Sequence, residues 1–135
     1  MISSPRLHKL NVDEVLTIKV MANADYSTDQ FTVTKGEAYK VWCGKGNWWV
    51  DMFIPAGPGG YPNPLANLFG QRVNGTRCFC LCGAYNNIDA DAFAIGNLAQ
   101  FTITQGSNLS FFANDVKGYE WNNWGSISVN IERIA

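Results

Sequence analysis

Apolar and polar residues alternate with a period of two along several short segments of the chain. Residues 15–21 read Val-Leu-Thr-Ile-Lys-Val-Met, and residues 126–131 place Ile127, Val129 and Ile131 on one side of the chain. Successive side chains of a strand point to opposite faces, so this alternation predicts half-buried β-strands in both segments.

Further strands are predicted between clusters of turn residues. They cover residues 31–34, 38–43, 77–85, 92–96, 101–104 and 109–113, and residues 48–50 form a loop or a short edge strand. The first two meet at a tight corner, and the last two read as a hairpin with a four-residue loop. Residues 54–64 hold four prolines and three glycines and predict a long loop, after which residues 65–70 have room for one helical turn. Roughly eight short strands without an amphipathic helix predict an all-β fold, a single-domain antiparallel β-sandwich of jelly-roll type.

Length and composition are those of one packed domain. The chain has 135 residues, of which 47% are hydrophobic and 16% charged, and its formal net charge is −1. We therefore expect one domain over residues 1–135, with residues 1–13 as a loosely ordered extension. A near-neutral chain lacks the clustered basic face that nucleic acid binding needs. No apolar run is long enough to span a membrane and no signal core stands at the N-terminus, so we expect cytoplasmic synthesis without membrane insertion, with release or surface association left open.

Three of the four cysteines, Cys78, Cys80 and Cys82, alternate with apolar residues. On a strand this spacing places the three thiols on one face, where free cysteines pack as small hydrophobic residues. The spacing does not match a structural zinc site, whereas a redox role or a disulfide to Cys43 stays open. Among the aromatics, Trp42 and Trp48 are expected in the core.

The loop of residues 114–126 carries more polar chemistry than a turn requires. It combines Asp115 with the adjacent amides Asn122 and Asn123, two glycines and three large aromatics. Carboxylate and amide oxygens are calcium ligands, and aromatic rings stack on sugars, so the loop indicates a calcium-dependent, sugar-facing site. The alternative is that these residues only form the turn.

The same loop resembles the C-terminal signature of the bacterial galactose-binding lectins of the PA-I (LecA) type. The matching residues are Asn114-Asp115-Val116, Gly118, Asn122-Asn123, Gly125-Ser126 and the closing segment 128–131. Weaker similarities follow the same order along the chain at residues 20–23, 82–84 and 95–97. The resemblance implies a jelly-roll-like β-sandwich that is not an enzyme, forms a homo-oligomer and holds galactosides through bound Ca²⁺.

Carried over residue by residue, the resemblance implies a set of calcium ligands. These are the side chains of Asp115, Asn122 and Asn123 and the main-chain carbonyls of Tyr119 and of Trp49 or a neighbour. The residues expected to face the sugar are Tyr61, Asn63, Asp115, Val116, Trp121 and Asn122. The sugar loop departs from the family, because Tyr61-Pro62-Asn63-Pro64 stands where the family has His-Pro-x-Gln.

The leading hypothesis is therefore a calcium-dependent lectin for galactose-type glycans. The alternative is a non-catalytic β-sandwich that works as an oligomerisation or protein-interaction module with a degenerate sugar site. An enzyme is not expected, because His8 is the single histidine and lies near the N-terminus. The rival in that class is a glycoside hydrolase that would need two facing carboxylates from among Asp51, Asp89, Asp115 and Glu120.

Overall fold

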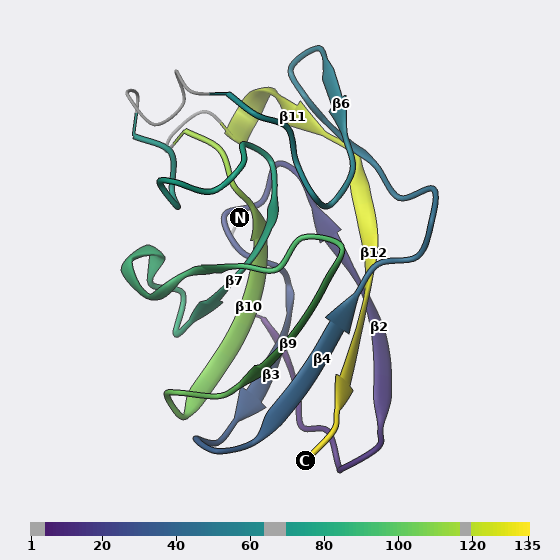
Figure 1. Ribbon diagram of the computed structural model, residues 1–135, viewed down its shortest axis with the longest axis vertical. Coiled ribbons are helices and arrows are strands. Elements are labelled where there is room, and N and C mark those ends of the chain that lie inside the picture. The colour runs from purple at the N-terminus through teal and green to yellow at the C-terminus, as the bar shows by residue number, and fades with distance from the viewer. Residues whose placement is uncertain (1–4, 64–69, 117–119) are drawn as a thin grey trace.

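The chain folds as a β-sandwich. The structure is a computed structural model that describes residues 5–63, 70–116 and 120–135 (Figure 1). No α-helix occurs within these ranges, where the helical elements are two short 3₁₀ turns. The elements in order are β1 (Arg6–His8), β2 (Val15–Met21), β3 (Asp29–Val33), β4 (Ala38–Trp42), β5 (Trp49–Asp51), β6 (Ile54–Ala56), β7 (Leu81–Tyr85), η1 (Asp89–Asp91), β8 (Phe93–Ala94), β9 (Leu98–Thr102), β10 (Ser107–Ala113), η2 (Glu120–Asn122), β11 (Asn123–Trp124) and β12 (Ser126–Arg133).

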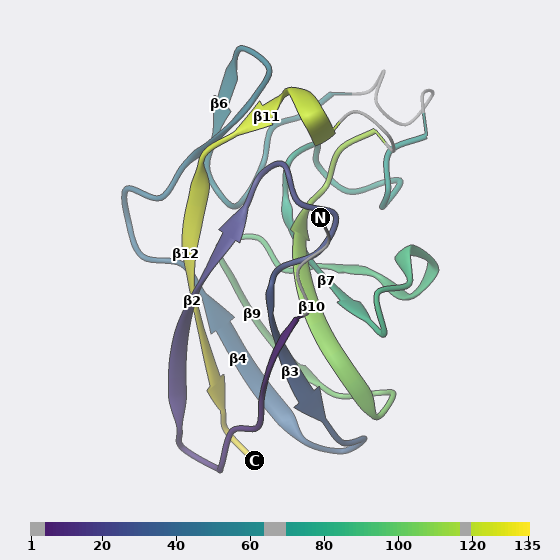
Figure 2. The same ribbon diagram turned by 180° about the vertical axis from the view of Figure 1, so that it is seen from behind.

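Two sheets form the layers of the sandwich, and a third, smaller sheet lies at one end. The five-stranded sheet has the order β1-β3-β10-β7-β8, and the four-stranded sheet has the order β2-β12-β4-β9. The third sheet, β11-β5-β6, lies at the end of the sandwich opposite the C-terminus (Figures 1 and 2). Every pairing is antiparallel except that of β1 with β3. The predicted antiparallel β-sandwich is confirmed.

The core lies between the two large sheets and follows the alternation of the sequence. Ile127, Val129 and Ile131 of β12 are buried, and Ile127 pairs with Val20 of β2 in register. From the opposite sheet, fully buried aromatic side chains complete the core, with an edge-to-face contact between Phe31 and Phe111 at 6.2 Å. Burial of each such side chain contributes about 1.5–3 kcal/mol to the stability of the folded state. The apolar faces of the alternating strands therefore stabilise the packing of the two sheets against each other.

The predicted hairpin over residues 101–113 is wrong. Strand β9 pairs with β4, whereas β10 pairs with β3 and β7, so the connection between them crosses from one layer to the other. Alternation of apolar residues identifies the buried face of a strand, and it is equally compatible with either sheet as the partner.

The predicted strand over residues 77–85 is shorter than expected, because the backbone of Phe79 has a positive φ of 62°. The strand therefore begins at Leu81, and the three cysteines do not share one face as predicted. Cys78 contacts Tyr61, while Cys82 packs in a separate apolar cluster that includes Phe112. The prediction that these cysteines are free and buried is confirmed.

The N-terminal segment takes part in the fold from residue 5 onward. Strand β1 pairs with β3, both Arg6 and His8 bond to the Asp29 carboxylate, and Leu10 is buried. The part of the expected extension that the structure describes thus belongs to the sandwich. The predicted helical turn at residues 65–70 falls almost entirely outside the described residues. No described helix is long and apolar enough to cross a membrane.

Candidate metal centre

The loop after β10 starts from a buried asparagine that holds the chain in place. The Asn114 Oδ1 accepts the Val73 N–H at 2.8 Å, and its Nδ2 donates to the carbonyls of Val73 at 3.0 Å and Arg77 at 3.2 Å. Three bonds from a fully buried amide leave little freedom for the backbone that follows. Asn114 thereby positions the next residue, Asp115, at the end of the sandwich where the small sheet lies.

Asp115 carries a buried carboxylate without a cationic partner. Its side chain is 4% exposed, and no described residue forms an ion pair with it. Oδ1 accepts the Val116 N–H at 2.7 Å, and Oδ2 accepts Nδ2 of Asn123 at 2.9 Å. Burial raises the pKa of Asp115 to about 6, the bond from Asn123 opposes this shift, and the charge of Asp51 adds to it. The carboxylate is therefore poorly compensated when it is ionised.

Two amide oxygens of the same loop lack a hydrogen-bond donor among the described residues. The Asn123 side chain is 3% exposed, and its Nδ2 also donates to the Ala22 carbonyl at 3.2 Å. The Oδ1 atoms of Asn123 and of Asn122 are both buried, and neither has a hydrogen-bond partner. A buried acceptor left in this state costs about 1–3 kcal/mol. The donor set of one carboxylate and two free amide oxygens fits a hard cation such as Ca²⁺.

A second carboxylate, that of Asp51, reaches the same place from the small sheet. Strand β5 pairs with β11 so that Asp51 stands opposite Asn123. The ligand atoms of Asp51, Cys78 and Asp115 all lie within 4.8 Å of one another. From the sequence, Asp51 is a candidate only for a hydrolase carboxylate and not for a metal ligand. A signal was present, because Asp51 lies two positions after the buried Trp49 and so shares its face of the strand.

Tyr61 and Cys78 surround the Asp51 carboxylate. The Tyr61 hydroxyl donates to Asp51 Oδ2 at 2.5 Å, and the Cys78 thiol donates to the Tyr61 oxygen at 3.4 Å and to Asp51 Oδ2 at 3.8 Å. Burial raises the pKa of the Cys78 thiol to about 11, and burial together with the bond to Asp51 raises the pKa of Tyr61 well above its usual value. Both groups therefore stay protonated at neutral pH and act as donors.

The structure places the other residues expected at the site as follows. Trp49 is a core residue, with its ring against Phe79 at 5.4 Å and its Nε1 donating to the Phe79 carbonyl at 3.2 Å. Val116 forms an isolated β-bridge with Gln71, and Asn63 is half-buried. Tyr119 lies outside the described residues. The structure thus brings Asp115, Val116, Asn123, Tyr61 and the unexpected Asp51 together.

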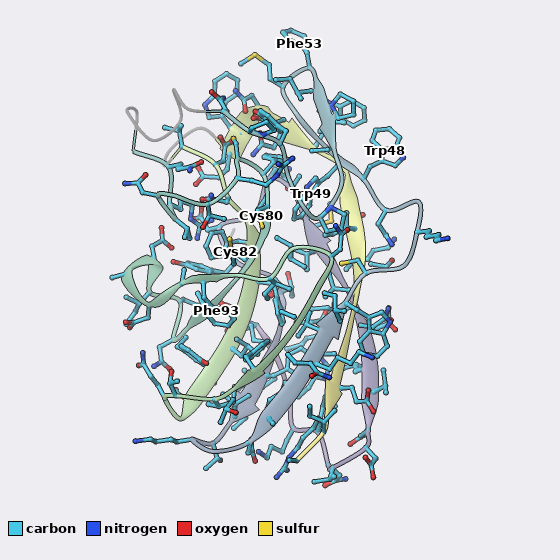
Figure 3. The ribbon with its side chains drawn as sticks, in the orientation of Figure 1. Trp48, Trp49, Phe53, Cys80, Cys82 and Phe93 are labelled. Atoms are coloured by element: carbon cyan, nitrogen blue, oxygen red, sulfur yellow. The ribbon has the colours of Figure 1, made fainter. Side chains whose placement is uncertain are left out.

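Large aromatic side chains are exposed around this end of the molecule. Trp121 of η2 is 76% exposed, Phe53 at the β5–β6 turn is 86% exposed, and Trp48 contacts Trp124 edge to face at 6.4 Å. Figure 3 shows Trp48 and Phe53 directed outward while Trp49 points into the protein. The prediction that Trp48 lies in the core is wrong. Trp48 is exposed, and its neighbour Trp49 on β5 is the residue that fills the interior.

Asp89 belongs to a separate and structural arrangement. Its two carboxylate oxygens accept Nη2 and Nε of Arg72 at 2.9 and 3.0 Å, and the Tyr26 hydroxyl donates to it as well. The Arg72 side chain is 3% exposed and its guanidinium stacks over Phe112 at 3.6 Å. This pair fastens the segment at residue 72 to the five-stranded sheet.

Comparison with known proteins identifies a similar solved structure. No family model and no curated protein matches the sequence. A solved structure, the N-terminal domain of EclA, described as a PllA-like lectin, matches with a TM-score of 0.64 over 87% of this chain and 94% of that domain, at 20% sequence identity. The chain has the fold of this lectin domain. At this identity the likeness concerns the fold, and membership of the PA-I (LecA) type stays a prediction.

Proposed function

We propose that this protein is a calcium-dependent lectin that binds galactose-type glycans. The observation that carries the proposal is that one loop holds the ionisable, buried Asp115 and two buried amide oxygens, those of Asn122 and Asn123, that have no hydrogen-bond partner among the described residues. A structural turn would satisfy these groups internally, because buried polar atoms without partners are rare in folded proteins. The lectin fold of the chain agrees with this reading.

The residues that would hold the ion are Asp115, Asn122 and Asn123 through their side chains. The resemblance adds the main-chain carbonyls of Tyr119 and of Trp49 or a neighbour. Bound calcium takes 6 to 8 oxygen ligands, so it would leave positions for a pair of sugar hydroxyls and would neutralise the buried carboxylate.

Specificity would depend on the residues around the ion. Trp121 presents an exposed ring next to Asn122, and such a ring stacks on the apolar face of a pyranose. Asn63 offers an amide from the loop that departs from the family pattern, and Val116 borders Asp115. Tyr61 is half-buried, and its hydroxyl donates to Asp51. Because the hydroxyl proton is used in this bond, Tyr61 would affect the sugar mainly by orienting Asp51.

A glycan array with and without calcium tests the proposal. We expect retention of galactose-terminated glycans in calcium that is lost in chelator and lost in Asp115→Ala. Asp13→Asn is the control, because Asp13 is exposed and bonds through its N–H to Arg133 near the C-terminus, at the other end of the sandwich. Sugar retention that is equal in chelator and in calcium contradicts the proposal.

A second candidate function is a protein-interaction or oligomerisation module with a degenerate sugar site. The exposed rings of Trp48, Trp124 and Phe53 favour it, since clustered exposed apolar side chains mark contact surfaces. A homo-oligomer is also what we propose for the lectin, because weak sites gain strength when several bind one surface. The mass of the protein in solution, measured with and without sugar, distinguishes the lectin from the interaction module. A separate assay tests for enzymatic activity, and there we expect no turnover of a nitrophenyl galactoside.

A further inference from the structure

Asp51 is a carboxylate at the candidate metal centre that the ligand set described above does not use. It comes from β5, whereas Asp115, Asn122 and Asn123 all come from the loop between β10 and β12. Its ligand atoms lie within 4.8 Å of those of Asp115. We infer that Asp51 is a further side-chain ligand of the cation, so that two carboxylates hold it, and that Tyr61 is the residue that positions Asp51. This inference rests on the proposed function for the presence of a bound cation.

Strand register brings the two carboxylates together. Asp51 stands directly opposite Asn123 in the β5–β11 pair, and opposite residues on one face of a ladder have Cβ atoms about 4.5–5.5 Å apart. The Asn123 amide in turn lies against Asp115 Oδ2. Asn123 thus pairs in register with Asp51 and bonds to Asp115.

The arrangement is incomplete without a positive charge. Two like charges this close repel each other, and no described residue pairs a cation with either. A second observation does not depend on the two acids. The Asn123 side chain is only 3% exposed, and its Oδ1 has no hydrogen-bond partner among the described residues. A cation shared by Asp51, Asp115 and this amide oxygen accounts for all three observations.

The donor atoms select a hard ion. Carboxylate and amide oxygens suit Ca²⁺, Mn²⁺ and trivalent lanthanides, whereas thiolates suit Zn²⁺ and Cd²⁺. Cys78 also carries a thiol, but this thiol donates hydrogen bonds to the oxygens of Tyr61 and Asp51 and is therefore not assigned as a ligand. The second carboxylate raises the negative charge of the site and with it the preference for a trivalent over a divalent ion.

Tyr61 determines which oxygen of Asp51 is available. Its hydroxyl donates to Oδ2 at 2.5 Å, which leaves Oδ1 for the cation and fixes the orientation of the carboxylate. Groups that orient metal ligands in this way typically change metal affinity by roughly 10- to 100-fold when they are removed.

The test is metal binding by the whole chain in the absence of sugar. Terbium luminescence sensitised by tryptophan, with displacement by calcium, measures both affinities in the parent, Asp51→Asn, Tyr61→Phe and the control Asp13→Asn. We expect Asp51→Asn to weaken calcium binding by at least roughly tenfold and terbium binding by more, and Asp13→Asn to leave both unchanged. Tyr61→Phe is expected to weaken calcium binding in the parent and to have no further effect in Asp51→Asn, since both act through one carboxylate.

The outcomes separate this inference from the proposed function. Calcium-dependent sugar binding with equal calcium affinity in Asp51→Asn and Asp13→Asn overturns the role of Asp51 and leaves the lectin standing. Calcium binding that depends on Asp51 without any sugar retention supports the inference and overturns the lectin. Tighter binding of Cd²⁺ than Ca²⁺, lost in Cys78→Ser, overturns the assignment of a hard-ion site. A parent protein that binds neither calcium nor terbium overturns both. Should Asp51→Asn fail to fold, Tyr61→Phe alone decides, and an unchanged calcium affinity in it counts against the inference.

Discussion

Replacing Asp115 by Asn should stabilise this protein in the absence of calcium and should remove the stabilisation that calcium gives to the parent. In the absence of calcium the folded state raises the pKa of Asp115 from 3.8 to about 6, mainly because the carboxylate is buried. A shift of about two pKa units corresponds to about 3 kcal/mol. The ionised carboxylate therefore lowers the free energy of unfolding by an amount of that order, and Asn, which has no charge, removes this cost.

The sign and the pH window follow from the direction of the shift. A carboxyl group with a folded pKa above its unfolded value binds protons more tightly in the folded state, so stability falls as pH rises through the window. The cost is absent below about pH 4, grows between pH 4 and 6, and is complete above it. We expect Asp115→Asn to match the parent at pH 3.5 and to exceed it by up to about 3 kcal/mol at pH 8.

Urea unfolding in chelator at pH 3.5 and pH 8 measures this difference. Addition of calcium should then stabilise the parent, by about 2.7 kcal/mol at a hundredfold excess over Kd, and should leave Asp115→Asn unchanged. A variant less stable than the parent at pH 8 in chelator would contradict this prediction, because it would show that the Asp115 charge is compensated inside the folded protein.

Three further changes probe the scaffold around the site, each measured by urea unfolding. Asp89→Asn should cost roughly 3 kcal/mol, because it leaves the buried Arg72 guanidinium unpaired, and the loss should shrink in a double variant that also carries Arg72→Met. Gly60→Ala should lower the free energy of unfolding more than Gly46→Ala, although both glycines have a positive φ. The reason is that a β-carbon at Gly60 would lie 2.6 Å from a backbone nitrogen, whereas Gly46 has open space around it. Equal losses of stability in the two variants would contradict this close packing at Gly60. Asn114→Ala should cost about 3 kcal/mol, about 1 for each of three buried hydrogen bonds, and should weaken calcium binding as well, whereas a loss below 1 kcal/mol would show that this amide does not hold the loop.

The polar chemistry of the 114–126 loop could be recognised from the sequence, since its carboxylate and amides all lie within one short segment between two strands. Asp115, Asn122 and Asn123 were predicted in this way, and Asp115 and Asn123 lie in hydrogen-bonding contact. Their assignment as calcium ligands stays a prediction, because it came from the resemblance. Tyr119, the remaining predicted ligand of this loop, lies outside the described residues.

The buried face of each strand follows from the sequence alone, because the period of two in a half-buried strand is a local property. Strand β2 has the predicted bounds, and β12 buries the three predicted residues. Which strands pair depends on the packing of the whole chain, and this packing makes residues 101–113 cross between the two large sheets. It also brought Asp51, Tyr61 and Cys78 to Asp115, because these residues come from separate segments whose meeting depends on how the sheets pack. Alternation is set by neighbours along the chain, whereas a site built across the end of a sandwich is set by contacts between segments far apart in sequence, and no local pattern records those.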